Sequence, residues 1–247
     1  MLAAALLGGC SAPPSRPPDL PPLHVMTGLP LFLAEGSVAD ILHKASPPPP
    51  VIAYLRRERQ VLPLDIARPE TLSGVKALLL IQPPALAPDE LVAIDAWVRS
   101  GGRAVILADP HLFWPSSLPK GDPRRAPYAS LLSPLLVHWG LRLRPDSPDA
   151  PPRPISFGDG DAVLSGSGHW QITAPSCRLI QPELARCKLG SGEVLVVSDA
   201  DWLNTPSADS AAFALLSALI AAVNPQSTLT QAPPSRVNLS LKNKDSP

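Results

Sequence analysis

Long apolar runs, strong charge and aromatic residues are all scarce in this sequence, and these shortages exclude several classes of protein. The longest apolar run, residues 211–223, is shorter than the roughly 18 residues that a membrane-spanning helix needs. Charged residues make up 17% of the chain and the formal net charge is zero, so no overall field attracts nucleic acid or an anionic membrane surface. We therefore expect no nucleic-acid partner.

The signatures of several common chemistries are also missing. The chain has no GxGxxG, GxxxxGK[ST], HExxH or GxSxG motif and no paired CxxC. Its five histidines are scattered without the spacing of metal ligands. We accordingly predict no cofactor, no metal site of a familiar type, no catalytic residues and no enzymatic activity.

Proline, by contrast, is abundant, and its distribution indicates how the chain is organised. The 34 prolines cluster near the ends and in connecting segments and avoid the apolar runs, as in a folded domain with Pro-rich connections. We expect an export signal and Pro-rich stalk at residues 1–22. A single α/β domain is expected at residues 23–224, and a disordered tail at 225–247.

The most regular stretch, residues 76–110, predicts a strand, a helix and a second strand. Residues 77–81 and 104–108 are uninterrupted apolar runs, typical of strands buried on both faces of a parallel sheet. Between them Pro88 suits the first helical position, apolar residues recur at spacings of three and four, and Gly101 suits a left-handed helix end. This is the pattern of a βαβ crossover, around which we expect the fold to be built.

The other apolar segments extend this pattern into a three-layer α/β fold. We expect strands at 24–33, 61–65, 141–144 and 193–198, helices at 38–43, 51–59, 128–140 and 207–223, and β-hairpins within 155–188. Pro63 argues that its strand lies at an edge or contains a bulge. The predicted fold is a mixed, mostly parallel sheet with helices on both faces and added β-hairpins in the C-terminal half.

Polar residues gather where the predicted strands end, which is where open parallel sheets usually bind ligands. The candidate ligand-binding residues are Glu35, Gln82, Asp109, His111, Asp199, Asp201 and Asn204. A cleft lined by the three aspartates could bind a cation or a polar ligand. The alternative is that they end strands and cap turns, which is common for short carboxylates, and the unspecific spacing favours this alternative.

The segment from residue 109 to 127 forms a predicted loop that is longer than a compact domain usually carries without a use. It combines aromatic and arginine side chains, a mixture favoured at protein interfaces. The candidate partner-binding residues are Phe113, Trp114, Arg124 and Arg125. The alternative is that Phe113 and Trp114 fold back over the sheet edge as part of the core.

The first cysteine indicates a lipid anchor. The opening residues MLAAALLGGC resemble a bacterial lipobox, in which the cysteine, here Cys10, is acylated and becomes the first residue of the mature protein. The short apolar part and the missing basic residues leave open a mis-assigned start or an ordinary terminus. We expect a lipid-anchored protein on the periplasmic side of a bacterial cell envelope.

The other two cysteines lie in a predicted hairpin, CRLIQPELARC. With a turn at QPE, the facing pairs are Ile180–Leu184, Leu179–Ala185, Arg178–Arg186 and Cys177–Cys187. Directly opposed residues lie about 4.5 Å apart at Cα, within the range of a disulfide. Because two arginines also face one another, two reduced cysteines remain the alternative.

Two stretches resemble the ABC-type uncharacterised transport system auxiliary family, which includes the auxiliary protein of the gliding-motility ABC transporter. The first is VKALLLIQPPALAPDELVAIDAWVRSGGRAVILADP, residues 75–110, and the second is GSGEVLVVSDADWLN, residues 190–204. Residues 130–146 are similar to the intervening helix and strand of the family. Together these stretches cover about half of the chain in the family's order.

The resemblance implies a class I glutamine-amidotransferase-like fold, related to the flavodoxin-like arrangement, without the amidotransferase triad. The sequence agrees, since DPHLFW follows the second strand where a Gly-x-Cys elbow would stand. The implied role is a non-catalytic extracytoplasmic accessory that binds an ABC transporter permease/ATPase complex. The alternatives are a divergent hydrolase using Asp109, His111, Asp199 and Asp201, or a structural envelope lipoprotein.

Overall fold

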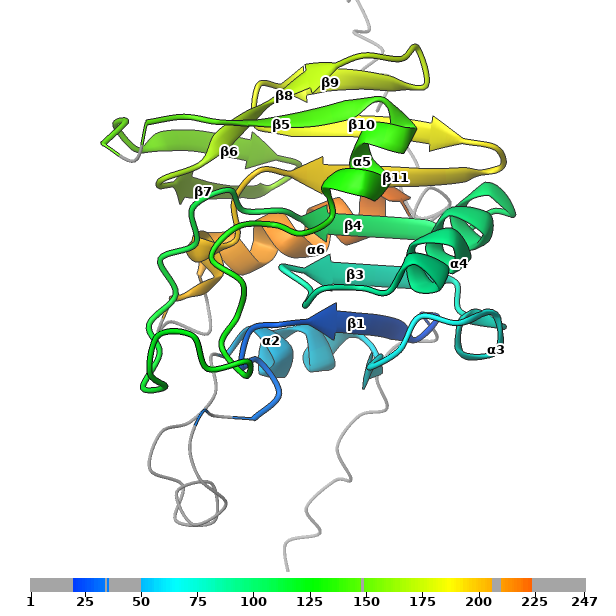
Figure 1. Ribbon diagram of the computed structural model, residues 1–247, viewed down its shortest axis with the longest axis horizontal. Helices are drawn as coiled ribbons and strands as arrows, with labels where there is room; N and C mark the ends of the chain where they lie inside the picture. Colours follow the sequence, from blue (N-terminus) through cyan, green and yellow to red (C-terminus); the bar gives the residue numbers. More distant parts are fainter. Residues whose placement is uncertain (1–19, 34, 36–49, 148, 206–209, 224–247) are drawn as a thin grey trace, which may run out of the picture.

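The computed structural model describes residues 20–33, 35, 50–147, 149–205 and 210–223, and a seven-stranded sheet lies at its centre (Figure 1). The strand order is β2-β1-β3-β4-β11-β10-β9. The strands are β1 Leu23–Thr27, β2 Val61–Pro63, β3 Ala77–Ile81, β4 Arg103–Leu107, β9 Cys177–Gln181, β10 Leu184–Leu189 and β11 Gly192–Val197. The pairs from β2 to β11 are parallel, whereas β10 and β9 extend the sheet antiparallel, so the predicted mostly parallel sheet is confirmed.

Helices cover both faces of this sheet. They are α2 Val51–Glu58, α3 Pro69–Leu72, α4 Pro88–Arg99, α5 Ser133–Trp139 and α6 Ala211–Val223, with a 3₁₀ turn η1 at Asp201–Leu203. In Figure 1, α4 and α5 lie in front of the sheet and α2 and α6 behind it. Successive residues of β3 alternate between the two cores: Leu79 packs with the α2 and α6 side, and Leu80 with the α4 and α5 side. The three-layer fold is confirmed.

Two small antiparallel sheets complete the C-terminal half. β5 Leu141–Pro145 pairs with β8 Gly168–Ile172, and β6 Arg153–Phe157 pairs with β7 Gly160–Leu164. The β6–β7 hairpin rests directly on α6, because a Cβ added at Gly160 would lie 2.0 Å from the backbone nitrogen of Leu215. Glycine is required there for close approach of the two backbones.

The central β3–α4–β4 crossover follows the sequence prediction. Pro88 begins α4, and Gly101 follows its end with a φ of 116°, in the left-handed region. The Trp97 indole donates a hydrogen bond to the carbonyl oxygen of Val75 at 3.1 Å. A Cβ at Gly102 would lie 2.5 Å from the Trp97 ring, so glycine lets the turn close over that side chain.

β2 ends two residues early, at Pro63, and two other predicted elements are much shorter than expected, which local hydrogen bonds explain. β1 ends at Thr27 because the Thr27 hydroxyl accepts the Leu29 backbone N–H at 2.9 Å, which starts a turn. The helix expected at 128–140 begins only at Ser133, since the Tyr128 carbonyl oxygen accepts the Leu112 backbone N–H at 2.8 Å. The short helix α3 was not predicted, and the helix expected at 38–43 lies outside the described residues.

The predicted disulfide is confirmed. Cys177 and Cys187 are bonded, with an S–S distance of 1.99 Å and Cα atoms 4.0 Å apart. The predicted facing pairs Cys177–Cys187, Arg178–Arg186 and Leu179–Ala185 are confirmed as well. The pair Ile180–Leu184 is wrong, because the register shifts next to Leu184, which faces Gln181 instead. A bulge beside the turn accounts for the difference.

The arginine pair that argued against this hairpin is compensated from the next strand. Glu193 lies on β11 and accepts a hydrogen bond from Arg186 Nη1 through Oε1, at 2.7 Å. Its other oxygen accepts one from Arg103 Nη1 at 3.0 Å. A carboxylate between two guanidinium groups therefore offsets the repulsion between Arg186 and Arg178.

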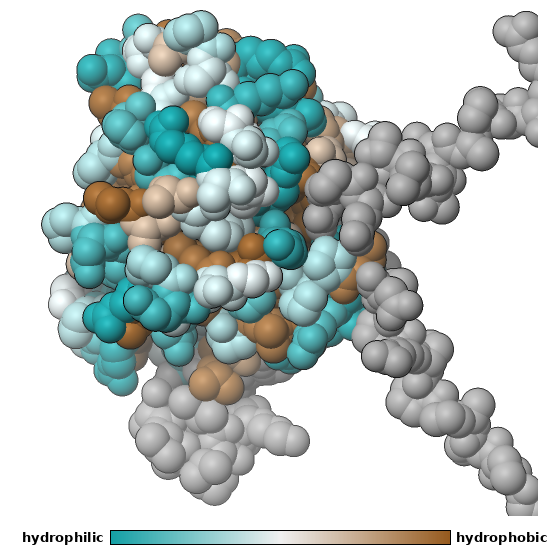
Figure 2. Space-filling model, turned by 90° about the vertical axis from the view of Figure 1, so that its right-hand side faces the viewer, coloured by the Kyte–Doolittle hydropathy of each residue, from teal (hydrophilic) through white to brown (hydrophobic). Residues whose placement is uncertain are grey.

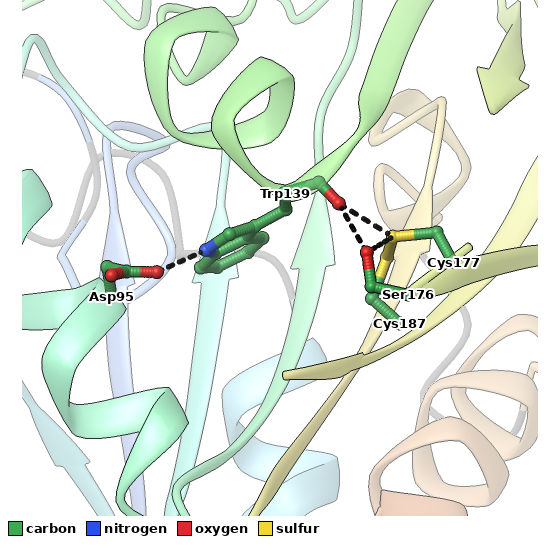
Figure 3. Close-up of a disulfide and its surroundings, with 5 residues drawn as sticks. All are labelled: Asp95, Trp139, Ser176, Cys177 and Cys187. Carbon is green, nitrogen blue, oxygen red and sulfur yellow. Dashed lines mark hydrogen bonds between the residues drawn. A yellow bond between two sulfur atoms is a disulfide. The ribbon is translucent and has the colours of Figure 1, made fainter. Parts of the chain in front are cut away.

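The disulfide is tied to the helical layer through Trp139 (Figure 3). The Trp139 carbonyl oxygen accepts a hydrogen bond from the Ser176 hydroxyl at 2.9 Å and lies 3.3 Å from Cys177 Sγ. Its indole donates to Asp95 Oδ1, on α4, at 2.7 Å. The end of α5 is thus fixed between α4 and the β9–β10 hairpin.

The side of the molecule where the parallel strands begin is shown in Figure 2. Apolar residues are interspersed with hydrophilic ones across this side. It contains a shallow groove of about 410 Å³, whose lining includes Lys76 and Trp97. Within the described part of the chain, no helix has both the length and the apolar character that crossing a membrane requires.

Candidate functional site

Three aspartates meet at the carboxyl ends of two neighbouring strands. Asp109 follows β4, and Asp199 and Asp201 follow β11, which pairs with β4 in parallel. One carboxylate oxygen from each of the three lies within 4.8 Å of the others. We call these residues the carboxylate cluster. The sequence placed them at strand ends, and the parallel pairing brings them together.

The two buried members of the cluster bind backbone N–H groups. Asp109 accepts from the nitrogen of His111 at 2.7 Å and from that of Ala200 at 2.9 Å. Asp199 accepts from the nitrogen of Ser165 at 2.8 Å and from that of Asp201 at 2.8 Å. Each of these two carboxylates therefore joins two segments of the chain, as the alternative reading of capping aspartates predicted.

The third member, Asp201, connects the cluster to the long loop. Both of its carboxylate oxygens accept the Phe113 backbone N–H, at 3.0 and 2.9 Å. Phe113 lies four residues beyond Asp109, so the start of the loop is held at both positions by carboxylates. Asp201 thereby fixes the backbone from which the Phe113 ring projects.

Burial and mutual repulsion raise the pKa of each carboxyl group in the cluster. Burial, opposed by backbone hydrogen bonds, raises the pKa of Asp109 to about 6. Burial and then the charge of Asp109 raise the pKa of Asp199 to about 8 and that of Asp201 to about 7. Near neutral pH the cluster consequently retains protons, since three adjacent charges would repel one another.

The same three oxygen ligands are of the type that calcium and magnesium prefer. Among the acidic, histidine and cysteine side chains of the described residues, one group has ligand atoms close enough to hold a metal ion. It consists of Asp109, Asp199 and Asp201. The cluster can therefore either share protons or bind a hard cation.

Gln82 positions the loop rather than a ligand. It follows β3, is fully buried, and has a φ of 40°, in the left-handed region that glycine favours. Its side-chain oxygen accepts the Asp109 backbone N–H at 2.9 Å, and its side-chain nitrogen donates to the carbonyl oxygens of Asp109 at 3.2 Å and Pro127 at 2.9 Å. One side chain thus fixes both ends of the loop 109–127.

The side chains of the remaining ligand candidates, Glu35, His111 and Asn204, do not belong to the group of three carboxylates. Glu35 Oε2 accepts hydrogen bonds from the Ser116 hydroxyl at 2.7 Å and the Ser117 backbone N–H at 2.9 Å, so it binds the long loop. Asn204 is exposed after η1. The His111 ring lies 6.0 Å from the Tyr128 ring, and its Nδ1 is buried without a hydrogen-bond partner. The Asn204 backbone N–H donates a hydrogen bond to the Asp201 carbonyl oxygen at 2.9 Å.

A second site adjoins the cluster on the long loop. It is a groove of about 690 Å³, and we call it the Phe113 groove. Its lining includes Glu35, Phe113, Lys120, Asp122, Arg125 and Tyr128. Phe113 and Tyr128 are each 58% exposed and lie edge to face, with ring centroids 6.5 Å apart. Sequence reasoning missed the role of Tyr128 because it placed that residue in a helix.

The predicted partner-binding residues divide into two groups. Phe113 is exposed, but Trp114 is only 8% exposed and packs in the core, which corrects the expectation that both aromatic rings face a partner. Arg124 is exposed and paired with Asp122, with nitrogen–oxygen distances of 3.0 and 2.7 Å. Arg125 donates to the Leu118 carbonyl oxygen at 3.1 Å and lines the groove.

Fold and site together define an α/β domain in which buried carboxylates hold an exposed loop. The family model described as ABC-type uncharacterized transport system matches residues 33–161, more than half of the chain. The protein therefore belongs to this family of ABC transport system proteins, in agreement with the resemblance seen in the sequence. No curated protein matches it.

Several solved structures are similar to this chain at low identity. The exo-β-1,4-mannosidase Op5Man5 from Opitutaceae bacterium strain TAV5 has 14% identity and a TM-score of 0.48, over 82% of this chain and 36% of its own length. A cytoplasmic protein from Salmonella typhimurium LT2 has 11% identity and a TM-score of 0.48, over 82% and 99%. A ThuA-like protein from Bacteroides uniformis has 12% identity and a TM-score of 0.45, over 87% and 95%. This chain spans about a third of the length of the mannosidase.

Proposed function

We propose that this protein is a non-catalytic accessory of an ABC transport system that binds the permease/ATPase complex through the Phe113 groove. Family membership supports the connection to ABC transport. The observation that carries the proposed binding mode is an exposed aromatic ring on a fixed backbone. Phe113 is 58% exposed, yet its N–H is held by Asp201.

A fixed backbone matters because ordering a loop on binding costs free energy. The Phe113 loop is already held by Asp109, Asp201 and Gln82, so a partner does not have to order it. Exposed aromatic rings beside arginine are typical of the residues that contribute most to protein interfaces. The Phe113 and Tyr128 rings therefore form the expected anchor point.

The charges around the groove indicate the chemistry of the partner. Asp122 pairs with Arg124, and Glu35 is hydrogen-bonded to serines of the loop. In the described part of the chain, the Lys120 ammonium has no hydrogen bond or ion pair, and Arg125 bonds only a carbonyl oxygen. A permease segment with an apolar side chain for the rings and a carboxylate for these cations fits the groove.

We further propose that the protein is attached through Cys10 to the periplasmic side of the bacterial envelope. Cys10 lies outside the described residues. The Cys177–Cys187 disulfide supports this placement, because disulfides persist in oxidising compartments. Membrane fractionation tests the anchor: wild type should sediment with membranes and Cys10→Ala should not. Finding the wild-type protein in the cytosolic fraction would contradict the proposed lipid anchor.

Two observations support binding rather than catalysis. The carboxylates of the cluster are engaged by backbone N–H groups, and no serine, threonine or cysteine side chain of the described residues hydrogen-bonds to them. Both cysteines in the described part of the chain are used in the disulfide. A hydrolase that works through a serine, threonine or cysteine nucleophile would need such a side chain beside these carboxylates.

Site-specific photocrosslinking in membranes tests the proposed function. A photoreactive phenylalanine at position 113 should crosslink to an ABC permease, identified by mass spectrometry. The same residue at Leu179, which is 45% exposed on the edge strand β9, is the matched control. Equal crosslinking to the permease from both positions, or none from position 113, would contradict the proposal.

A further inference from the structure

A buried arginine, Arg59, lies behind the sheet at the end of α2. Arg59 is only 4% exposed, and its Nε and Nη1 atoms are buried without a hydrogen-bond partner. The nearby carboxylate of Glu58 is 4.0 Å from Arg59 Nη2 and already accepts a hydrogen bond from the Ser217 hydroxyl at 2.8 Å. A buried guanidinium with two unused donors is costly, so this position favours an anionic partner.

A groove of about 720 Å³ adjoins Arg59, and we call it the Arg59 groove. It lies between α2, α6 and the β6–β7 turn, and its other lining residues include Tyr54, Phe157, Asp159, Ala218, Ala221 and Ala222. The helix α6 presents only small side chains along the groove, and two aromatic rings add apolar surface. Burial lowers the pKa of Arg59, and the neighbouring charge of Glu58 acts in the opposite direction.

We propose that the Arg59 groove binds a small organic anion. Its carboxylate or phosphate group accepts hydrogen bonds from Arg59, since the planar guanidinium matches both groups. The apolar part of the ligand lies along the alanines of α6. Glu58 and Asp159 add negative charge to the lining, which disfavours ligands of high negative charge. This site is separate from the Phe113 groove and does not depend on the proposed function.

Three probes separate the contributions of the charged group and of the apolar part. Hexanoate carries both, acetate carries the carboxylate alone, and hexanol carries the apolar chain alone. On the full-length protein, hexanoate should raise the melting temperature with increasing concentration, and acetate should act only at much higher concentration. Hexanol should have no comparable effect. Equal stabilisation by hexanol and hexanoate would overturn the proposal.

Two variants locate the site, and calorimetry with hexanoate measures binding. Arg59→Met keeps the apolar stem, removes the guanidinium donors and should weaken binding about tenfold to a hundredfold, the usual effect of losing a charge-assisted hydrogen bond. Arg178→Met, at an exposed position on β9, is the control and should bind like wild type. Unchanged binding by Arg59→Met would overturn the proposal.

Ala221→Phe keeps the arginine and fills the groove, so it provides an independent test. It should also weaken hexanoate binding at least tenfold, and it decides the question if Arg59→Met does not fold. A groove-filled variant that binds hexanoate as tightly as wild type would show that binding occurs elsewhere, which contradicts the proposal.

Discussion

Asp201 accepts the backbone N–H of Phe113 through both carboxylate oxygens, at 3.0 and 2.9 Å. This contact joins the two candidate sites, because Asp201 belongs to the carboxylate cluster and Phe113 to the exposed groove. The other two aspartates hold the neighbouring turns in the same way. The state of the cluster and the position of the Phe113 ring are therefore physically connected.

The raised pKa values predict how stability depends on pH. The three aspartates keep their protons in the folded protein at pH values where the unfolded chain, in which an aspartate has a pKa of about 4, has lost them. Their contribution is fully present at low pH and is lost as pH rises through about 6 to 8. The free energy of unfolding should fall between pH 5 and pH 8.

Asp201→Asn tests this cause. The amide oxygen can still accept the Phe113 N–H, while the charge is removed. At pH 8 we expect the variant to be more stable than wild type, on the order of 1 kcal/mol, with a smaller difference at pH 5. Asp161→Asn, at an exposed position on β7, is the control. Urea unfolding at the two pH values measures the effect, and wild-type stability that rises from pH 5 to pH 8 would contradict it.

Phe113 and Trp114 are adjacent in sequence, but truncating them should destabilise the protein to very different extents. Trp114→Ala removes a core side chain and should destabilise the protein by about 3–5 kcal/mol. Phe113→Ala removes a mostly exposed ring and should cost less than about 1 kcal/mol. Thermal unfolding of both variants distinguishes the two. Similar losses for the pair would assign Phe113 to the core and remove it from the binding surface.

The central β3–α4–β4 crossover is the part of the fold that the sequence predicted best. β3 and α4 were predicted closely because buried strands and a one-sided helix leave strong periodic patterns. β5–β8 pairing was not predicted, since β-strands separated by a long stretch of chain leave no local signal. Likewise, no sequence pattern indicates the role of Gln82, although its side chain holds both ends of the loop 109–127.

For the candidate site, the sequence located the aspartates but not their surroundings. Strand ends are predictable, and parallel pairing of β4 with β11 brings Asp109 and Asp199 together. The partners of these carboxylates are backbone N–H groups, which every residue except proline carries, so the sequence does not indicate which residues donate them. The burial of Trp114 beside an exposed Phe113 depends on tertiary packing and left no sequence pattern.

Loss of the disulfide should weaken the β9–β10 hairpin without abolishing the fold. Cys177→Ala with Cys187→Ala should reduce the free energy of unfolding by roughly 2–3 kcal/mol, as expected for a short closed loop. Reduction of the wild type should lower its stability similarly, and the double variant should not respond to reductant. A double variant as stable as the oxidised wild type would contradict a stabilising role.

The protein should release no ammonia from glutamine. In the described part of the chain, both cysteines are bonded to one another, and the residues after β4 hold a capping aspartate where a nucleophile elbow would be needed. Ammonia release is measured before and after alkylation of thiols. Turnover that alkylation abolishes would overturn the non-catalytic proposal.

The central claim is that the Phe113 groove binds an ABC permease/ATPase complex, and the affinity of purified full-length protein for that complex tests it most directly. Because truncating an anchor ring at an interface typically costs at least 2 kcal/mol, Phe113→Ala should raise Kd by about thirtyfold or more, with folding unchanged. Leu179→Ala, on the edge strand, should leave Kd unaltered. A Phe113→Ala variant that folds normally and binds the complex as tightly as wild type would contradict the account.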